Sequence, residues 1–198
     1  MQSQRVDATG IVLAGGRSSR MGRNKAILEV GGERIIDRTV SLFNSLFKEV
    51  ILVTNTPDEY AGLGVKMVTD ILPDKGSLGG IYTGLFHASR NYSFIASCDM
   101  PFLNRRLIEF LLNLKVGYDV VVPRLNSGHE PLHAVYSKGC LNPIEAMIKK
   151  GDLRIIGFYP VVNVREVSEE ELGPYLSDPS PFMNINTPDE YEEALRKR

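Results

Sequence analysis

The stretch GIVLAGGRSSRMGRNK, residues 10–25, joins a short apolar run to a segment rich in glycine and in cationic side chains. Residues 10–14 are apolar at successive positions, a pattern typical of a strand that is covered on both faces of a sheet. The glycines that follow allow backbone N–H groups to approach an anion, and the Arg and Lys side chains add charge-assisted hydrogen bonds to phosphate oxygens. The stretch therefore predicts a strand that ends in a phosphate-binding loop.

Further β-branched runs alternate with stretches of helical period along the chain. This alternation, at about 30 residues per unit, is typical of a mostly parallel sheet with helices on both faces. We expect a single α/β domain over residues 1–198, a Rossmann-like three-layer sandwich with a mostly parallel, twisted sheet. The predicted strands span residues 10–14, 50–53, 65–68, 93–97, 119–122 and 161–164.

Two amphipathic helices are predicted between these strands, the second with Asn104 as its N-cap. Residues 27–36 instead predict a small hairpin, because Gly31 and Gly32 separate two short segments of strand character. The apolar stripes of the two helices consist of Ile36, Val40, Phe43 and Phe47, and of Leu107, Ile108, Leu111 and Leu112.

The hexapeptide Asn-Thr-Pro-Asp-Glu-Tyr occurs twice, at residues 55–60 and 186–191. Its Thr, Pro and Glu predict a helix start with a capping box. The Asn before each cap is expected where a strand ends and a helix begins, which is the edge at which open α/β proteins bind ligands.

Composition and charge exclude several function classes. The net charge is −1, whereas a protein that binds nucleic acid or anionic membranes usually has a clear positive excess. No apolar run approaches the roughly 20 residues of a membrane helix, and the N-terminal residues lack the apolar core of a signal peptide. Cys98 and Cys140 have no metal-ligand spacing, so we expect reduced thiols and a cytoplasmic protein.

Two familiar phosphate-binding loops do not fit residues 10–25. A Walker A loop requires adjacent Gly and Lys, whereas Gly22 and Lys25 are three positions apart. The Rossmann glycine fingerprint is absent from this segment, and the second strand ends in Val-Thr-Asn without an acidic residue.

The segment instead resembles the nucleoside-triphosphate-dependent nucleotidyltransferases, and more closely the molybdenum cofactor guanylyltransferase family. The similarity extends over nearly the whole chain. It implies the fold of the nucleotide-diphospho-sugar transferases and the transfer of GMP from GTP to the molybdopterin form of the cofactor, with Mg²⁺ and release of pyrophosphate. Asn24 replaces an Asp that is frequent in this family. The matching motifs are residues 13–25, Asp70 with residues 76–80, residues 97–103, residues 130–132 and residues 184–188.

The resemblance implies the roles of particular residues. It assigns GTP to about residues 1–110 and the acceptor to about residues 111–198. Asp99 is the expected metal ligand, while a turn-forming role for Asp70 and a helix-cap role for Asp99 remain alternatives. Lys25, Arg20 and Asp99 are the expected catalytic residues. GTP binding is assigned to Leu13, Ala14, Gly15, Gly16, Lys25, Asn55, Asp70, Gly79, Gly80 and Asp99, and acceptor binding to Arg154, Asn184 and Asn186.

Other interpretations of the same residues stay open. One is a nucleotidyltransferase that uses CTP, or a phospho-sugar or cobinamide-phosphate acceptor, and another is a non-catalytic nucleotide-binding module. GTP and the molybdopterin cofactor are the expected substrates, and molybdenum insertion or molybdoenzyme maturation proteins are candidate partners. His129 and His133 are expected to be strand-end residues with ordinary surface partners, and Cys98 a small buried side chain.

Overall fold

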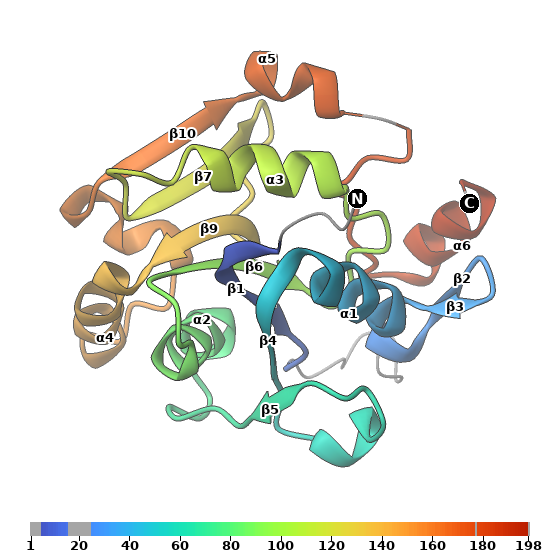
Figure 1. Cartoon of the computed structure of the whole chain (residues 1–198), viewed down its shortest axis with the longest axis horizontal. Coiled ribbons are helices and arrows are strands. Elements are labelled where there is room, and N and C mark those ends of the chain that lie inside the picture. The colour runs from blue at the N-terminus through green and yellow to red at the C-terminus, as the bar shows by residue number, and fades with distance from the viewer. Residues whose placement is uncertain (1–4, 16–24, 177, 198) are drawn as a thin grey trace.

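The computed structural model describes residues 5–15, 25–176 and 178–197. An eight-stranded sheet has the order β10-β7-β9-β6-β1-β4-β5, with β8 paired to β7 (Figure 1). The strands are β1 (Val6–Leu13), β4 (Phe47–Val53), β5 (Lys66–Val68), β6 (Tyr92–Ser97), β7 (Val120–Leu125), β8 (Gly128–His129), β9 (His133–Ser137) and β10 (Val164–Ser168). The helices are α1 (Ile35–Leu46), α2 (Gly76–His87), α3 (Arg105–Asn113), α4 (Leu141–Lys149), α5 (Glu169–Leu172) and α6 (Pro188–Arg196).

The pairing of β1 sets the direction of the central strands. β1 pairs in parallel with both β4 and β6, and β5 continues the parallel set beyond β4. β10 is parallel to β7, whereas β9 is antiparallel to β6 and to β7. The expected mostly parallel α/β sheet is confirmed, and β9 is a strand that the sequence pattern did not predict.

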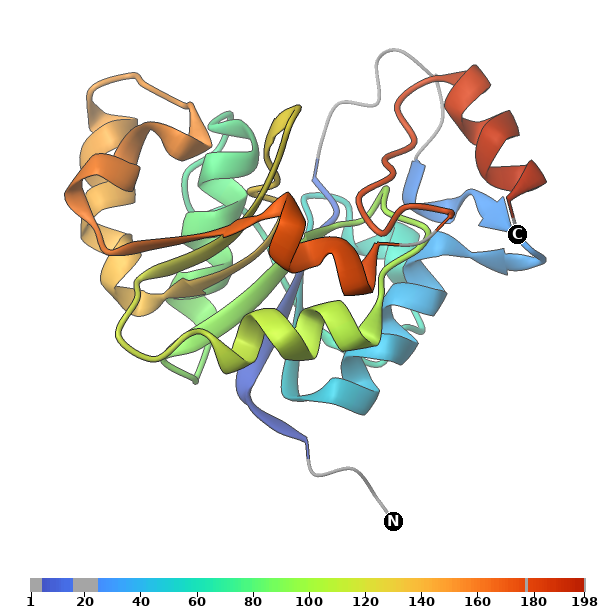
Figure 2. The same cartoon turned by 90° about the horizontal axis from the view of Figure 1, so that it is seen from above.

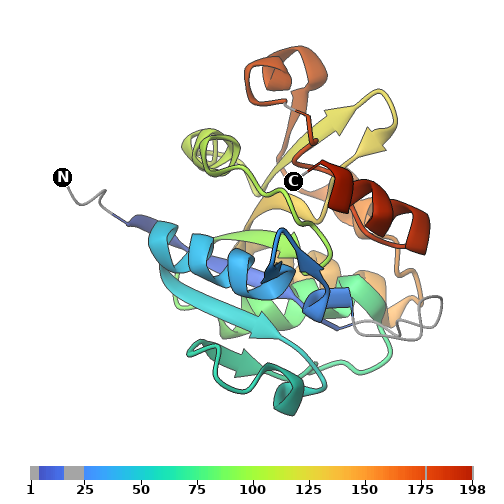
Figure 3. The ribbon, with the colours of Figure 1, turned by 90° about the vertical axis from the view of Figure 1, so that its right-hand side faces the viewer.

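Helices cover both faces of the sheet (Figures 1 and 3). α1 and α3 contribute to the core on one face, together with Ala8 and Val12 of β1. α2 and α4 contribute to the core on the other face, together with Ile11 and Leu13. β1 is therefore buried on both sides, as its unbroken apolar run predicts.

Two glycines allow the helices to pack closely on β1. A Cβ atom on Gly10 would lie 2.6 Å from Cδ2 of Phe47 and 2.7 Å from Cδ2 of Phe43. On the opposite face, a Cβ atom on Gly84 of α2 would lie 2.7 Å from Cγ2 of Ile11. Side chains at these positions would push both helices away from the central strand.

The predicted hairpin is confirmed as β2 (Glu29–Val30) paired with β3 (Glu33–Arg34). It lies beside α6, and Val30, Ile185 and Ala194 belong to one small apolar cluster between them (Figure 2). The C-terminal helix is thus packed against the hairpin that follows the first loop.

Local signals had mixed outcomes. The side chain of Asn104 accepts hydrogen bonds from the amides of Arg106 and Leu107, which confirms the predicted cap. Thr187 and Glu190 form the predicted capping box. The expectation that Asn186 ends a strand was wrong, because the described residues between η5 (Gly173–Tyr175) and α6 form no strand. The first copy of the hexapeptide forms only the 3-10 helix η2 (Pro57–Tyr60), without a side-chain cap.

Two predicted boundaries were wrong. Phe47, placed in the first helical stripe, is the first residue of β4. The strand expected at residues 161–164 begins only at Val164, because residues 155–161 form the 3-10 helix η4 (Ile155–Val161). In the described part of the chain, no helix is long and apolar enough to cross a membrane, and Cys98 and Cys140 form no disulfide.

His133 is a fully buried histidine at the start of β9. Burial lowers the pKa of His133 from its ordinary value of 6.5 to about 3, because the charged imidazolium would lose its hydration. The expectation of surface partners was wrong for this residue. The folded protein therefore keeps His133 neutral at pH values where the unfolded chain protonates it.

The low pKa of His133 predicts that the folded protein loses stability in acid. Between pH 6.5 and about 3 the unfolded state binds the extra proton, so stability rises with pH and is lost as the pH falls through this window. From about pH 7.5 to about pH 5, where most carboxylates stay ionised, the free energy of unfolding should fall by about 2 kcal/mol on account of His133. Urea denaturation of the wild type and of His133→Leu measures this, since the variant should lose that much less stability. Equal losses in both proteins would contradict the assignment.

Candidate active site

The predicted nucleotide-side residues follow adjacent strand ends at one edge of the sheet. Backbone hydrogen bonds continue past the strands: the amide of Cys98 donates to the carbonyl of Leu13 at 3.0 Å, and that of Ala14 to Val53 at 2.9 Å. The amide of Thr54 in turn donates to Val68 at 2.9 Å. The residues that follow β6, β1, β4 and β5 are thereby placed in a row, in the order Asp99, Gly15, Asn55 and Asp70.

Asn55 and Asp70 are joined by a reciprocal pair of hydrogen bonds. Nδ2 of Asn55 donates to Oδ2 of Asp70 at 2.8 Å, and the amide of Asp70 donates to Oδ1 of Asn55 at 3.0 Å. Oδ1 of Asp70 is buried and has no hydrogen-bond partner in the described structure. The pair therefore holds the Asp70 carboxylate in a fixed position, with Oδ2 bonded to Asn55 and Oδ1 unpaired.

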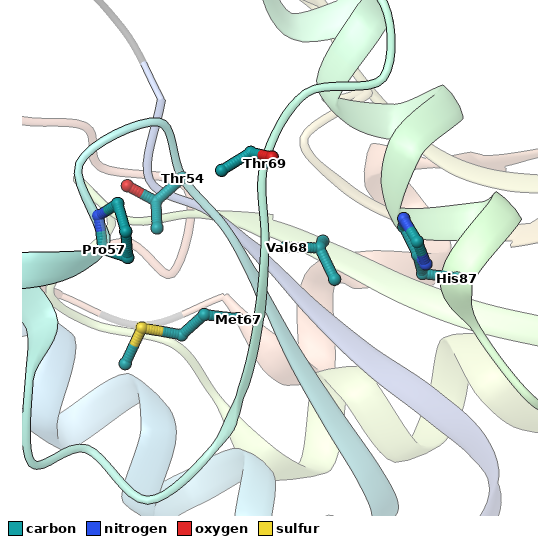
Figure 4. A pocket seen from close by; sticks show the side chains of 6 residues that line it. All are labelled: Thr54, Pro57, Met67, Val68, Thr69 and His87. Carbon is teal, nitrogen blue, oxygen red and sulfur yellow. The ribbon is translucent and has the colours of Figure 1, made fainter.

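A pocket of about 310 Å³ lies beside the edge strand β5 (Figure 4). Thr54 and Thr69, which immediately precede Asn55 and Asp70, contribute to its wall. Met67 and Val68 of the edge strand β5 point to opposite sides in Figure 4. The remaining lining residues are Pro57 and His87.

Asp99 lies two positions after the end of β6 and is half-buried. Its Oδ1 is buried without a hydrogen-bond partner in the described part of the chain. No group of three or more His, Cys, Asp and Glu side chains able to hold a metal occurs among the described residues. A lone orphaned carboxylate of this kind fits a Mg²⁺-type ion, which is bound by one or two carboxylates together with substrate phosphates and water.

The start of α2 faces the same edge. Gly76 has a φ of +57°, and the N-cap residue Lys75 makes no side-chain capping bond. A Cβ atom on Gly80 would lie 3.4 Å from Cδ2 of Leu13, so this end of the helix packs on the end of β1. At Gly79 a Cβ atom would lie 2.8 Å from Cβ of Lys75, which gives this glycine a packing role in the turn. The uncapped first turn is suited to an anion.

The segment that precedes α6 is hydrogen-bonded to the backbone at Asp99. The amide of Ile185 donates to the backbone carbonyl of Asp99 at 3.0 Å. Asn184 and Asn186 lie on either side of Ile185, and both side chains are half-buried. Nδ2 of Asn184 donates to the carbonyl of Phe182 at 3.2 Å. The structure thus brings two predicted acceptor-side residues next to the predicted metal ligand.

Arg154 is not drawn into this group. Its guanidinium binds the Asp152 carboxylate at 3.0 and 2.6 Å, and its side chain is 78% exposed. These hydrogen bonds lower the pKa of Asp152 to about 2. A role for Arg154 at the acceptor would require it to exchange Asp152 for the ligand.

Three predicted site features lie outside the described residues. These are Gly16, Arg20 and the side chain of Lys25. For Lys25 the structure describes only the backbone, which begins η1 (Lys25–Ile27). Of the rest of that loop, Leu13 and Ala14 are nearly buried, with 7% and 8% exposure, whereas Gly15 is exposed and a Cβ atom there would meet nothing within 4 Å.

Sequence reasoning missed a charged cluster formed by residues of β7, β8 and β10. One oxygen of Glu166 lies 2.7 Å from Nε2 of His129, and the other accepts from Arg124 at 2.9 Å. The hydrogen bond with His129 and, to a smaller extent, the one from Arg124 lower the pKa of Glu166. The cross-strand pairing of Arg124 with His129 brings these side chains together, and no local sequence pattern predicts it. The expected surface partner of His129 is thus Glu166.

Comparison with known proteins identifies the family to which this chain belongs. Residues 10–161 match the family model of the MobA-like NTP transferase domain. The chain belongs to this family. It is 40% identical to a probable molybdenum cofactor guanylyltransferase of Pelotomaculum thermopropionicum, over 96% of this chain and 92% of the relative. It is 41% identical to the molybdenum cofactor guanylyltransferase of Desulfosudis oleivorans, over 94% of this chain and 93% of the relative.

Solved structures agree with this family. The crystal structure of molybdopterin-guanine dinucleotide biosynthesis protein A from Archaeoglobus fulgidus superposes with a TM-score of 0.82 at 26% identity, over 95% of this chain and 97% of that one. A 2-C-methyl-D-erythritol 4-phosphate cytidylyltransferase from Thermus thermophilus has a TM-score of 0.69 at 16% identity, over 96% and 98% of the two chains, and shares the fold. The resemblance inferred from the sequence motifs is confirmed, and the chain is a nucleotidyltransferase.

The Asn55–Asp70 pair yields a stability prediction. In Asn55→Asp a second carboxylate would replace the amide that donates to Asp70, so like charges would meet at the sheet edge. We expect the free energy of unfolding to fall by about 1 kcal/mol at neutral pH and to recover below about pH 4, where one carboxylate is protonated. Urea denaturation at both pH values tests this, with Asn91→Asp at the exposed bend before β6 as the control. Equal effects of the two substitutions would contradict the prediction.

Proposed function

We propose that this protein transfers GMP from GTP to the molybdopterin form of the molybdenum cofactor, giving the guanine dinucleotide form and pyrophosphate. The names of relatives that match more than nine-tenths of the chain support this reaction. The structural observation that carries it is the hydrogen bond from the Ile185 amide to the Asp99 carbonyl. This bond joins the acceptor-side segment to the end of the strand that bears the proposed metal ligand.

The nucleotide would occupy the row of strand ends. The Asn55–Asp70 pair offers a carboxylate oxygen to N–H donors of the nucleoside, and the first-turn amides of α2 offer donors to its phosphates. Leu13, Ala14, Gly15 and Gly16 would bring backbone groups to the nucleotide, as the sequence motif predicts. Gly79 and Gly80 would keep the start of α2 close to β1.

Asp99 would hold Mg²⁺, and the orphaned Oδ1 supports this choice. When bound, the ion supplies charge neutralisation to the triphosphate and to the departing pyrophosphate. The metal's identity remains part of the proposal.

The reaction needs little covalent help from the protein. An oxygen of the acceptor's terminal phosphate attacks the α-phosphorus of GTP, and the bond from that phosphorus to the β-phosphate oxygen breaks. The acceptor phosphate is already ionised at neutral pH, so no general base is needed. Lys25 and Arg20 would neutralise the charge that develops at the α-phosphate and on pyrophosphate. Catalysis then depends mainly on positioning the two phosphates in line.

Asn184 and Asn186 would contact the pterin, because amides both donate to and accept from its polar edge. Arg154 would contact the acceptor phosphate after release from Asp152. We place the GTP side within about residues 1–110 and the acceptor side within about residues 111–198. A cytoplasmic location and contact with molybdenum insertion or molybdoenzyme maturation proteins belong to the same proposal.

Asp99→Asn tests the metal ligand. We expect guanylyl transfer to fall on the order of 10²–10³-fold, since the amide keeps the shape but loses the charge that binds the cation. Initial rates of pyrophosphate release measure the loss, and unchanged far-UV circular dichroism shows that the fold is intact. Asp74→Asn, an exposed position before α2 with a positive φ that Asn tolerates, is the control and should retain activity. Full activity of Asp99→Asn would end the proposed role.

The choice of nucleotide is tested by calorimetric titration with GTP, CTP, ATP and UTP in the presence of Mg²⁺. GTP should bind about tenfold or more tightly than the other three, because only guanine has two adjacent N–H donors on its pairing edge. One of them would donate to the unpaired Oδ1 of Asp70, and the other would share Oδ2 with the amide of Asn55. Tighter binding of CTP would overturn the guanylyl assignment and leave the nucleotidyltransferase fold untouched.

A further inference from the structure

The residue that the proposed mechanism leaves unexplained is His133. Its side chain is fully buried, and neither Nδ1 nor Nε2 has a hydrogen-bond partner in the described structure. A neutral imidazole always carries one N–H, and leaving such a group unpaired in a protein interior is unfavourable. An aliphatic side chain would avoid this penalty, so the imidazole requires another explanation.

Two phenylalanine rings contact the imidazole edge to face. The ring centroid of Phe94 lies 5.1 Å away with an interplanar angle of 88°, and that of Phe182 lies 4.9 Å away with an angle of 70°. Edge-to-face packing is the favoured geometry for aromatic pairs, and it allows a ring N–H to point at a π-face. His133 is therefore held between a strand residue of the central sheet and a residue of the C-terminal segment.

Phe182 is an anchor of that segment. It is 6% exposed and belongs to the main core, although residues 176–187 form no helix or strand among the described positions. Its carbonyl accepts from Nδ2 of Asn184, and Ile185 donates to Asp99 three residues further on. Phe182 and Ile185 thus anchor the backbone on either side of Asn184, close to Asp99.

His133 also lies beside the strand that bears Asp99. It pairs in register with Ala96 of β6, and the amide of Ser97 donates to the carbonyl of Leu132 at 3.2 Å. One buried side chain thereby contacts the segment that bears Asn184 and belongs to the strand next to the proposed metal ligand.

We propose that His133 is a positioning residue for acceptor binding: its imidazole seats the Phe182 ring and so holds Asn184 and Ile185 against Asp99. This role rests on the proposed function, because it takes residues 184–186 as the acceptor side. It predicts a selective defect, in which acceptor binding suffers and nucleotide binding does not.

Steady-state kinetics of guanylyl transfer test the selectivity. His133→Leu should raise KM for the molybdopterin acceptor about tenfold and leave KM for GTP within about twofold of the wild type. Phe182→Leu should give the same split, and the double variant should be no worse than either single one, because both changes break one contact. Val135→Ala, a buried change on the same strand and facing the same core, should leave both KM values unchanged. An unchanged acceptor KM in His133→Leu, or multiplied effects in the double variant, would overturn the proposal.

Hydrogen exchange separates this proposal from the proposed function. In the ligand-free protein, the Ile185 amide of His133→Leu and of Phe182→Leu should exchange about tenfold faster relative to the amides of β6 than in the wild type. Val135→Ala should leave that ratio unchanged, since it weakens the core beside the same strand but keeps the imidazole of His133 against Phe182. A wild type that binds no GTP would refute the proposed function, while the exchange ratio would still decide the role of His133. An unchanged ratio in His133→Leu would overturn that role.

Discussion

The site depends on the parallel pairing of β1 with β4 and β6. Because parallel strands end at the same edge, this pairing places the residues that follow β6, β1, β4 and β5 side by side. The two cores on either face of β1 hold the strand in place, and Gly10 and Gly84 allow α1 and α2 to approach it closely. A shift in this register would separate Asp99 from the Asn55–Asp70 pair.

The segment proposed to bind the acceptor is attached to this edge by a different means. Residues 176–187 contribute no strand to the sheet in the described structure, so ladder hydrogen bonds do not fix them. Two buried side chains do so instead: Phe182 enters the main core beside His133, and Ile185 enters the cluster between β2–β3 and α6. Between them lies Asn184. A proposed nucleotide side fixed by strand pairing and a proposed acceptor side anchored by buried side chains suit a reaction in which two large substrates must meet at one phosphorus atom.

Local sequence signals predicted much of this organisation. Apolar runs predicted most of the strands, and the caps at Asn104 and Thr187 predicted two helix starts. Because Asn55, Asp70 and Asp99 follow predicted strands, they were expected at one edge of the sheet, where the structure has them. The prediction failed where long-range packing decides the outcome. β9 starts with a polar His and ends with a polar Ser, and both are buried: the His packs against Phe94 and Phe182, and the Ser donates a hydrogen bond to Asp119. The pairing of Arg154 with Asp152, and the cluster around Glu166, likewise depend on side-chain geometry that periodicity does not contain.

A crystal structure with Mg²⁺ and a GTP analogue that cannot be cleaved between the α- and β-phosphates would show whether the ends of β6, β1, β4 and β5 form one nucleotide site. We expect the ion on a carboxylate oxygen of Asp99 and the guanine on the side of Asn55 and Asp70. We also expect the Ile185 amide to keep its bond to the Asp99 carbonyl. An ion held away from Asp99, or a nucleotide bound away from these strand ends, would show that the proposed site is wrong.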